Sequence, residues 1–190
     1  MLRALIIDNN TKHLEEIVSL LSEFDIKKEV TDYKTYRYGK NDFDLYILSG
    51  GNDHLAVNSR IYYPEELKLV KNTTKPVIGI CLGFQIICFA FNTKLEKLDR
   101  PLEKITITTI EASDHNIFGN LLPLKANERH KWGVKELSDE LLGLAKSKYG
   151  WEIVKHKEKP IYGIQFHPEI ITEDTKGYLL FYKIIKDISK

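Results

Sequence analysis

Apolar runs and helical segments alternate along the first half of the chain, and this order constrains the fold more than any other feature. Residues 2–7, 43–48 and 76–80 are short, mainly apolar runs, as expected of strands that are buried on both faces. Between them, residues 14–24 place apolar side chains at helical spacing, and Pro64 stands where a second helix would begin. Strands that alternate with helices predict a parallel sheet with right-handed crossovers.

The second half of the chain has a different pattern. Residues 104–110 alternate with threonines, which is typical of an antiparallel or edge strand. Further strands are expected at 142–147, 151–156 and 161–166, and helical spacing returns at 175–188. No repeat, low-complexity segment or linker interrupts this order. The sequence therefore predicts a single α/β domain over residues 1–190, with a mostly parallel central sheet flanked by helices and with additional antiparallel strands.

Composition excludes several classes of protein. The chain has 190 residues and a formal net charge of +1, so no global field attracts it to nucleic acid or to a membrane surface. Its apolar runs are far shorter than the roughly 20 residues that span a bilayer. The two cysteines, Cys81 and Cys88, would lie about 10 Å apart on one helix, which is too far for a disulfide. We therefore expect a reduced, cytoplasmic protein without nucleic-acid or membrane partners.

The sharpest local feature is the sequence G-I-C-L-G at residues 79–83, between an expected strand and an expected helix. Glycines two residues before and after Cys81 are typical of a tight strand-to-helix turn that exposes a nucleophile at the carboxyl end of a sheet. The unpaired amides at the start of the helix favour an anion there, and hence a reactive thiolate. The alternative for Cys81 is a buried structural cysteine beside two packing glycines. Cys88 lies mid-helix among apolar residues, and we interpret it as part of the core.

A second motif ends the last strong strand, where residues 163–169 read G-I-Q-F-H-P-E. Strand alternation sends His167 to the face opposite Phe166, and Pro168 prevents the strand from continuing. A carboxylate such as Glu169 beside a histidine fixes its tautomer and stabilises the imidazolium. Cysteine, histidine and glutamate are together the groups that thiol acyl transfer needs. Taken alone, the motif is equally consistent with a polar turn. We expect no metal here, because the other histidines lack ligand spacing to it.

Together these residues resemble the class I (triad-type) glutamine amidotransferases. The family carries G-x-C-x-G-x-Q, here residues 79–85, and F/W-H-P-E, here residues 166–169. It also carries a strand that ends in S-G-G, here residues 49–51. All three motifs occur in the family's order, and the resemblance covers nearly the whole chain. It implies a flavodoxin-like α/β fold.

The resemblance also implies a role for each matching residue. Cys81 would attack the side-chain amide of glutamine, release ammonia and leave a γ-glutamyl thioester that water hydrolyses. His167 would transfer the protons, and Glu169 would orient His167. The backbone amides of Gly51 and Leu82 would form the oxyanion hole, where glycine allows a close approach of the backbone to the reacting centre.

The stretch 154–169 looks most like the separate glutaminase subunit of archaeal-type GMP synthases. In that system ammonia passes to a partner, the ATP-dependent GMP synthase subunit, which aminates XMP. ATP and magnesium then belong to the partner, and this chain needs no cofactor of its own. The alternatives are the glutaminase of anthranilate synthase or of another two-part synthase, a stand-alone γ-glutamyl hydrolase or peptidase, and a non-catalytic regulatory domain. The intact set of Cys81, His167 and Glu169 argues against the last.

Substrate-binding residues are expected at Gln85 and in the block E-R-H-K-W-G-V at residues 128–134. His130 aligns with the family's histidine, but its neighbours differ from the Ser-His and Tyr-His-Ser patterns of the family. In the family this block contacts the glutamine backbone or the partner, which implies substrate contacts for His130, Lys131 and Trp132. Alternatively, the histidine pairs with the glutamate of the same block, the tryptophan packs on the domain, and the basic residues form a solvated face.

Overall fold

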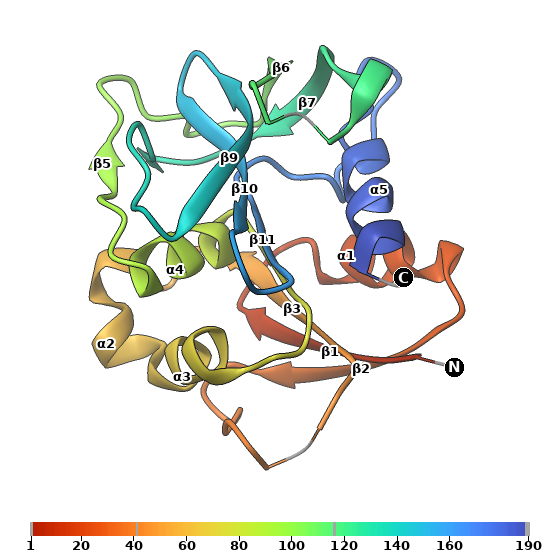
Figure 1. Ribbon diagram of the computed structural model, residues 1–190, viewed down its shortest axis with the longest axis vertical. Coiled ribbons are helices and arrows are strands. Elements are labelled where there is room, and N and C mark those ends of the chain that lie inside the picture. The colour runs from red at the N-terminus through yellow and green to blue at the C-terminus, as the bar shows by residue number, and fades with distance from the viewer. Residues whose placement is uncertain (1, 41, 116, 189–190) are drawn as a thin grey trace.

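The computed structural model describes residues 2–40, 42–115 and 117–188. Its main feature is a nine-stranded sheet in the order β2-β1-β3-β4-β11-β10-β9-β6-β7 (Figure 1). The nine strands are β1 (Leu2–Asn9), β2 (Ile26–Asp32), β3 (Leu45–Gly51), β4 (Val77–Ile80), β6 (Thr106–Ala112), β7 (Leu124–Glu128), β9 (Leu141–Ser147), β10 (Gly150–His156) and β11 (Ile161–Ile164). A separate two-stranded sheet pairs β5 (Glu96–Lys97) with β8 (Trp132–Gly133).

The large sheet has a parallel half and an antiparallel half. The strands β2, β1, β3, β4 and β11 are parallel neighbours, whereas β10, β9, β6 and β7 add antiparallel pairs. This confirms the predicted α/β fold with a mostly parallel core and additional antiparallel strands. Because parallel strands run in one direction, the carboxyl ends of β1, β3, β4 and β11 meet along one edge, where ligands bind in sheets of this kind.

Helices cover both faces of the parallel half (Figure 1). The helices are α1 (Leu14–Leu20), α2 (Ser59–Tyr62), α3 (Pro64–Asn72), α4 (Leu82–Ala90) and α5 (Tyr178–Ile188), with short 3-10 turns at η1 (Leu21–Glu23), η2 (Ala56–Asn58) and η3 (Gly119–Leu121). Alternation along the strands supplies two cores. In β1, Ala4 and Ile6 pack with α1 and α5, whereas Leu5 and Ile7 pack with α3 and α4.

Two kinds of element were not predicted from the sequence. One is the set of very short elements, β5, β8 and α2, which are too brief to give a periodic signal. The other is β7, whose last residues Asn127 and Glu128 are polar but fully buried. A strand that buries polar side chains has no apolar run, so its sequence is that of a loop. This strand matters for function, because it leads directly into the block at 128–134.

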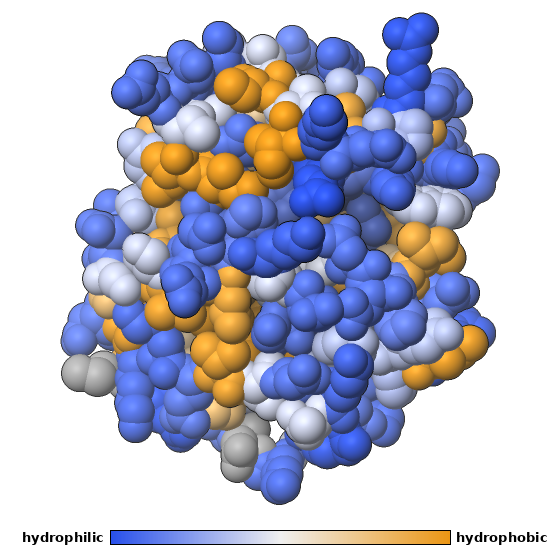
Figure 2. All heavy atoms as spheres, turned by 180° about the vertical axis from the view of Figure 1, so that it is seen from behind, coloured by the Kyte–Doolittle hydropathy of each residue, from blue (hydrophilic) through white to orange (hydrophobic). Residues whose placement is uncertain are grey.

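The surface shown in Figure 2 is mainly hydrophilic, with separate apolar patches between the polar side chains. No helix within the described residues is long and apolar enough to cross a membrane.

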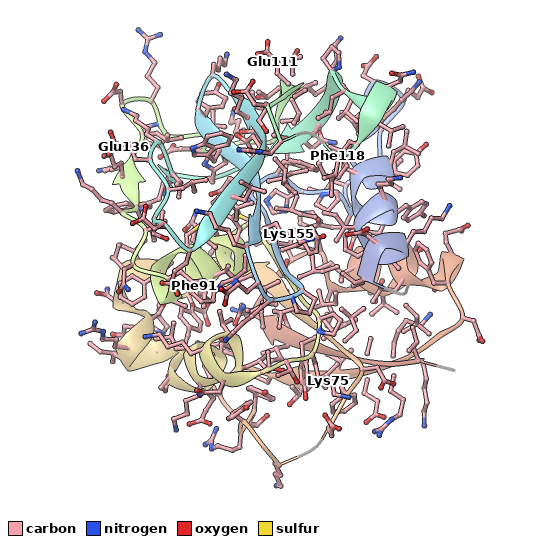
Figure 3. All side chains as sticks on the ribbon, in the orientation of Figure 1. Lys75, Phe91, Glu111, Phe118, Glu136 and Lys155 are labelled. Carbon is pink, nitrogen blue, oxygen red and sulfur yellow. The ribbon has the colours of Figure 1, made fainter. Side chains whose placement is uncertain are left out.

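Side chains fill the space between the sheet and its helices (Figure 3). Lys155 on β10, labelled there, has its Nζ 3.8 Å from Oδ2 of Asp187 on α5, so an ion pair joins the antiparallel half to the last helix. Cys81 and Cys88 are both buried and form no disulfide, as predicted. Neither thiol is therefore used to cross-link the chain.

Candidate active site

A strained turn at Cys81 joins β4 to α4. Cys81 has φ 51° and ψ −97°, a backbone conformation that non-glycine residues rarely adopt. The flanking glycines make the turn possible. A Cβ on Gly79 would overlap the backbone of Gly83, and a Cβ on Gly83 would overlap the carbonyl of Leu48 on β3. The predicted tight turn is therefore present, and strain of this kind is concentrated at functional sites.

The sheet brings His167 to this turn from the neighbouring strand. The strands β4 and β11 are parallel neighbours, and the Cys81 amide donates to the carbonyl of Ile164 at 2.8 Å. The chain then leaves β11, and the His167 amide donates to the carbonyl of Asn127 on β7 at 2.7 Å. The side chains of Cys81 and His167 line the same hollow. Two motifs that are 86 positions apart, from 81 to 167, thus share one site.

The imidazole of His167 lies between Cys81 and Glu169. Its Nδ1 is 2.8 Å from Oε1 of Glu169, and both side chains are buried. Because Nδ1 faces the carboxylate, Nε2 is the nitrogen left for the sulfur of Cys81, which interacts with the same ring. Burial lowers the pKa of His167, but the sulfur and the carboxylate outweigh it and raise the pKa well above its usual value. The protonated form of the His167 ring is therefore favoured at a position between the sulfur and the carboxylate.

Two small hollows flank Cys81, and both are also lined by Gly51 and Arg129. His167 lines one of them, together with Thr11 and His13. The other collects all the residues that the sequence analysis assigned to the oxyanion hole or to substrate: Gly51, Leu82, Gln85, His130, Lys131 and Trp132. The sequence-predicted residues therefore lie around one thiol.

The side-chain amide of Gln85 is fixed by two acceptors. Its Nε2 donates to the backbone carbonyl of Trp132 at 3.1 Å and to Oε1 of Gln165 at 3.2 Å. A backbone carbonyl only accepts, so the nitrogen of Gln85 must point to Trp132. The side-chain oxygen of Gln85 is then the group that a ligand in the hollow can use.

The ring of His130 is directed into the protein. Its side chain is 1% exposed, Nδ1 lies 2.9 Å from the carbonyl of Trp132, and Nε2 lies 2.8 Å from Oε2 of Glu128. Burial lowers the pKa of His130 and raises the pKa of Glu128 to about 8. The pairing with Glu128 is the alternative that the sequence left open. The ring thus supports the wall of the hollow through Trp132, whereas exposed Lys131 lies at the surface near Glu103.

The family model for class I glutamine amidotransferases matches residues 5–187. The chain belongs to this family. Among similar amidotransferase relatives, a subunit of the glutamine-hydrolysing GMP synthase of Methanothermobacter thermautotrophicus is 31% identical over 175 residues, which is 90% of each chain. The corresponding subunit of Methanobrevibacter smithii is 34% identical over 153 residues, 77% of this chain and 75% of the relative. The bifunctional protein TrpGD of Thermotoga maritima is 27% identical, and the chain spans only 33% of its length.

Solved structures show the same amidotransferase fold. A Thermoplasma acidophilum protein, provisionally described as a GMP synthase subunit, aligns with a TM-score of 0.84 over 100% of this chain and 94% of its own. A glutamine amidotransferase of Thermotoga maritima aligns with a TM-score of 0.75 over 99% of this chain and 85% of its own. The sequence identities are 24% and 20%, so these likenesses concern the fold alone.

A buried polar network supports the S-G-G strand end of this amidotransferase, and the sequence analysis did not single it out. The Asn9 amide donates to Oγ of Ser49 at 2.8 Å, and its Nδ2 donates to the Ser49 carbonyl and to Oε1 of Glu66, both at 3.1 Å. A Cβ on Gly51 would overlap the carbonyl of Asn9. Burial raises the pKa of Glu66 to about 8. The available signal was a polar residue, Asn9, two positions after the first apolar run.

Arg129 is a second residue of the amidotransferase site that the sequence analysis did not assign to function. Its backbone carbonyl lies 3.7 Å from the sulfur of Cys81, within reach of a thiol donor. Its guanidinium donates through Nε to the carbonyl of Glu103, which directs the side chain along the surface. No residue type specifies a backbone carbonyl contact, so the sequence carried no signal for it.

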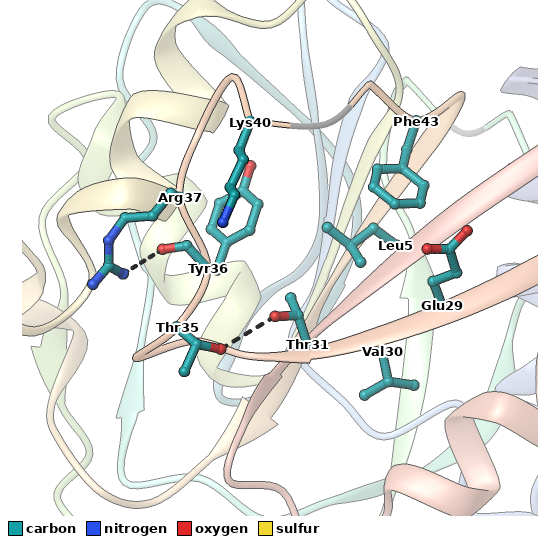
Figure 4. A pocket seen from close by; sticks show the side chains of 9 residues that line it. All are labelled: Leu5, Glu29, Val30, Thr31, Thr35, Tyr36, Arg37, Lys40 and Phe43. Carbon is teal, nitrogen blue, oxygen red and sulfur yellow. Dashed lines mark hydrogen bonds between the residues drawn. The ribbon is translucent and has the colours of Figure 1, made fainter.

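A larger hollow lies at the edge strand β2, away from Cys81 (Figure 4). The described residues that line it include Glu29, Tyr36, Arg37 and Lys40, and they shape a polar recess beside Leu5 of β1. None of the described lining residues is shared with the hollows at Cys81, and none carries a thiol or an imidazole. This hollow therefore offers neither a thiol nucleophile nor an imidazole base.

Proposed function

We propose that this chain hydrolyses L-glutamine to glutamate and ammonia and delivers the ammonia to a synthase partner, the ATP-dependent subunit of a GMP synthase, which aminates XMP. The observation that carries the proposal is the meeting of Cys81, His167 and Glu169 beside a hollow that contains the expected substrate residues. Membership of the class I glutamine amidotransferases supports it.

The chemistry is acyl transfer through a thioester. The thiolate of Cys81 attacks the side-chain amide carbon of glutamine, and the backbone amides of Gly51 and Leu82 stabilise the oxyanion. His167 gives its proton to the nitrogen as the C–N bond breaks, so ammonia leaves and a γ-glutamyl thioester remains. His167 then takes a proton from water, which attacks the thioester and releases glutamate and the thiolate. Glu169 holds the tautomer and orientation of the ring throughout.

Polar groups of the wall hold the substrate. The side-chain oxygen of Gln85 accepts a hydrogen bond from glutamine, since both hydrogens of its amide are already used. Lys131 supplies a cation for the α-carboxylate, because its surface ion pair with Glu103 at 3.9 Å is weak enough to exchange. Trp132 contributes the fixed carbonyl and part of the wall, and His130 acts by holding that carbonyl.

The choice of partner rests on the relatives. Those with 31% and 34% identity are each named as one subunit of a glutamine-hydrolysing GMP synthase, and a synthase with a named subunit implies a second one. We assign the ATP and magnesium chemistry to that second subunit, so this chain needs no cofactor for glutamine hydrolysis itself. Ammonia requires a protected path between the two subunits, because ammonium is not a nucleophile.

The test measures glutamine hydrolysis by the purified chain alone and with the ATP-dependent subunit of a GMP synthase, XMP and ATP. We expect stimulation of at least tenfold and GMP formation with the partner present. Cys81→Ala abolishes hydrolysis with or without the partner. Cys88→Ala keeps most of the activity, because Cys88 is buried within α4 and lines neither hollow at Cys81.

Three outcomes contradict the proposal in different ways. Equal loss in the two cysteine variants would remove Cys81 as the nucleophile. Rapid turnover of γ-glutamyl peptides that a partner does not change would favour a stand-alone hydrolase. Absence of both turnover and labelling of Cys81 by a glutamine-like electrophile would favour a regulatory domain.

A further inference from the structure

Glu128, His130 and Glu152 form a buried cluster. It lies behind the wall of the hollow that Gln85 and Trp132 line beside Cys81, which we call the glutamine hollow. They come from the end of β7, from the loop that follows it and from β10. Counted over the whole residue, backbone included, their exposed fractions are 0%, 5% and 1%. One imidazole nitrogen and one carboxylate oxygen from each glutamate all lie within 4.8 Å of one another. The hydrolysis mechanism proposed above uses none of the three as an acid, base or nucleophile.

The tautomer of His130 leaves a lone pair facing this cluster. Nδ1 lies 2.9 Å from the carbonyl of Trp132, which only accepts, so Nδ1 carries a proton. Nε2 then faces Oε2 of Glu128 at 2.8 Å. A histidine whose Nδ1–H is fixed by a backbone carbonyl while Nε2 points to carboxylates has the arrangement of a metal ligand with its outer hydrogen bond already made.

Oε2 of Glu152 is buried without a hydrogen-bond partner among the described residues, and the carboxyl group of Glu128 has, besides His130, only the side chain of Thr108 as a hydrogen-bonding neighbour. The other oxygen of Glu152 accepts from Oγ of Ser147 at 2.6 Å. Protonation of the two carboxyl groups would remove their charge but give Oε2 of Glu152 no partner, and an unpaired buried polar atom costs about 1–3 kcal/mol. A bound cation balances the charge and gives that oxygen a partner.

We propose that Glu128, His130 and Glu152 bind one divalent transition-metal ion, with Zn²⁺ as the best fit. One imidazole nitrogen and two carboxylates are a donor set that Zn²⁺ accepts. Donors at roughly 2.0–2.2 Å from such an ion lie about 3.0–3.5 Å apart, so the ligand atoms, which now lie within 4.8 Å of one another, must move closer together to bind it.

The ion has a structural role in this position. It fixes the ring of His130, and the ring holds the Trp132 carbonyl, which in turn accepts from Nε2 of Gln85. The glutamine hollow is thereby braced from behind, without contact between the ion and the reacting sulfur.

The test is zinc binding by the full chain, measured by competition with a chromophoric chelator and by metal analysis after dialysis. Cys81 and His167 are themselves a possible zinc site, so the assay is run on Cys81→Ala. We expect one Zn²⁺ per chain, retained in Cys81→Ala and weakened at least tenfold by His130→Gln or Glu152→Gln. Glu66→Gln is the matched control, because Glu66 is also buried with an unpaired oxygen but lies outside the cluster.

A second measurement does not depend on the cluster variants folding. Co²⁺ added to Cys81→Ala should give visible d–d absorption that Zn²⁺ displaces. The proposal is overturned if Cys81→Ala binds no stoichiometric Zn²⁺ or Co²⁺, or if folded His130→Gln and Glu152→Gln bind zinc as tightly as their parent. Because glutamine turnover is not measured, the result is independent of the proposed function.

Discussion

The proposed hydrolysis depends on the charge of the His167 imidazole. Burial opposes its protonation, yet the sulfur of Cys81 and the carboxylate of Glu169 raise its pKa well above the usual value. The ring therefore stays protonated through neutral pH and serves as the acid for ammonia. As pH rises through the raised pKa, the ring loses that proton and activity falls.

Glu169→Gln tests this arrangement with little change of shape. The amide can still hydrogen-bond the ring but no longer supplies the negative charge that raises the pKa of His167. We expect kcat for glutamine hydrolysis to fall at least tenfold, and up to about 10⁴-fold as for analogous triads. The alkaline limb of the pH–rate profile should also move to lower pH. The measurement is kcat across pH 5–10.

Glu173→Gln is the control for the Glu169 variant, since Glu173 is exposed and lies four positions further along the same segment. Its profile should match that of the unmodified protein. An alkaline limb that stays in place in Glu169→Gln, while kcat falls, would mean that the carboxylate does not set the charge of His167.

Neighbouring elements hold the S-G-G strand end, and one of their contacts depends on pH. Glu66 on α3 accepts from Asn9 at the end of β1, and burial raises its pKa from 4.5 to about 8. Its folded-state pKa is above its unfolded value, so the stability it contributes is complete below about pH 4.5 and is lost as pH rises through 8. Ionisation of Glu66 therefore lowers the free energy of unfolding by at most about 3–5 kcal/mol.

Glu66→Gln should therefore reduce the pH dependence of stability. The measurement is the free energy of unfolding in urea from pH 4.5 to 9. Over this range it should fall in the variant by at least about 1 kcal/mol less than in the unmodified protein. Glu65→Gln on the same helix is the control, because Glu65 is only partly buried and its pKa is lowered by its hydrogen bond to Lys68. Equal slopes for Glu66→Gln and the unmodified protein would show that Glu66 ionises freely in the folded state.

The turn between β4 and α4 depends on glycine for space. A Cβ on Gly83 would overlap the Leu48 carbonyl, whereas a Cβ on Gly50 would lie 3.5 Å from His167 Cε1 and 3.6 Å from Cys81 Cβ, which are ordinary contacts. We expect Gly83→Ala to lower the free energy of unfolding by about 1–3 kcal/mol or more. Gly50→Ala should change it by less than about 1 kcal/mol. Urea unfolding of both variants checks this, and a larger loss for Gly50→Ala would contradict the packing argument.

The strands β1, β3, β4 and β11 were predictable at the scale of elements because they are mainly apolar and the turns that follow them carry glycine or proline signals. The meeting of Cys81 with His167 was predictable for the same reason, since Cys81 directly follows β4 and His167 lies shortly after β11. The strand β7 and the Asn9–Glu66 contact were not predictable, because they bury polar side chains whose partners are distant in sequence. The inward direction of His130 also depends on such a partner, Glu128.

At the scale of the whole molecule, one sheet joins the two halves of the chain. The strand β11 pairs in parallel with β4 from Ile161 opposite Val77 to Ile164 opposite Ile80, and antiparallel with β10. The ion pair between Lys155 and Asp187 adds a second link. This continuity supports the expectation that residues 1–190 form a single domain, which unfolds as one cooperative unit.

Two spectroscopic probes test that expectation, because both tryptophans lie in the second half of the chain whereas most helices lie in the first. Trp132 lies on β8 and Trp151 on β10, where its ring packs over Gly143 of β9. In Trp132→Phe, the fluorescence of Trp151 follows the antiparallel half, while far-ultraviolet circular dichroism is dominated by helices, most of which lie in the first half. We expect the two urea transitions to coincide. A fluorescence midpoint clearly below the dichroism midpoint would mean that the antiparallel half unfolds separately and that the chain is not one cooperative domain.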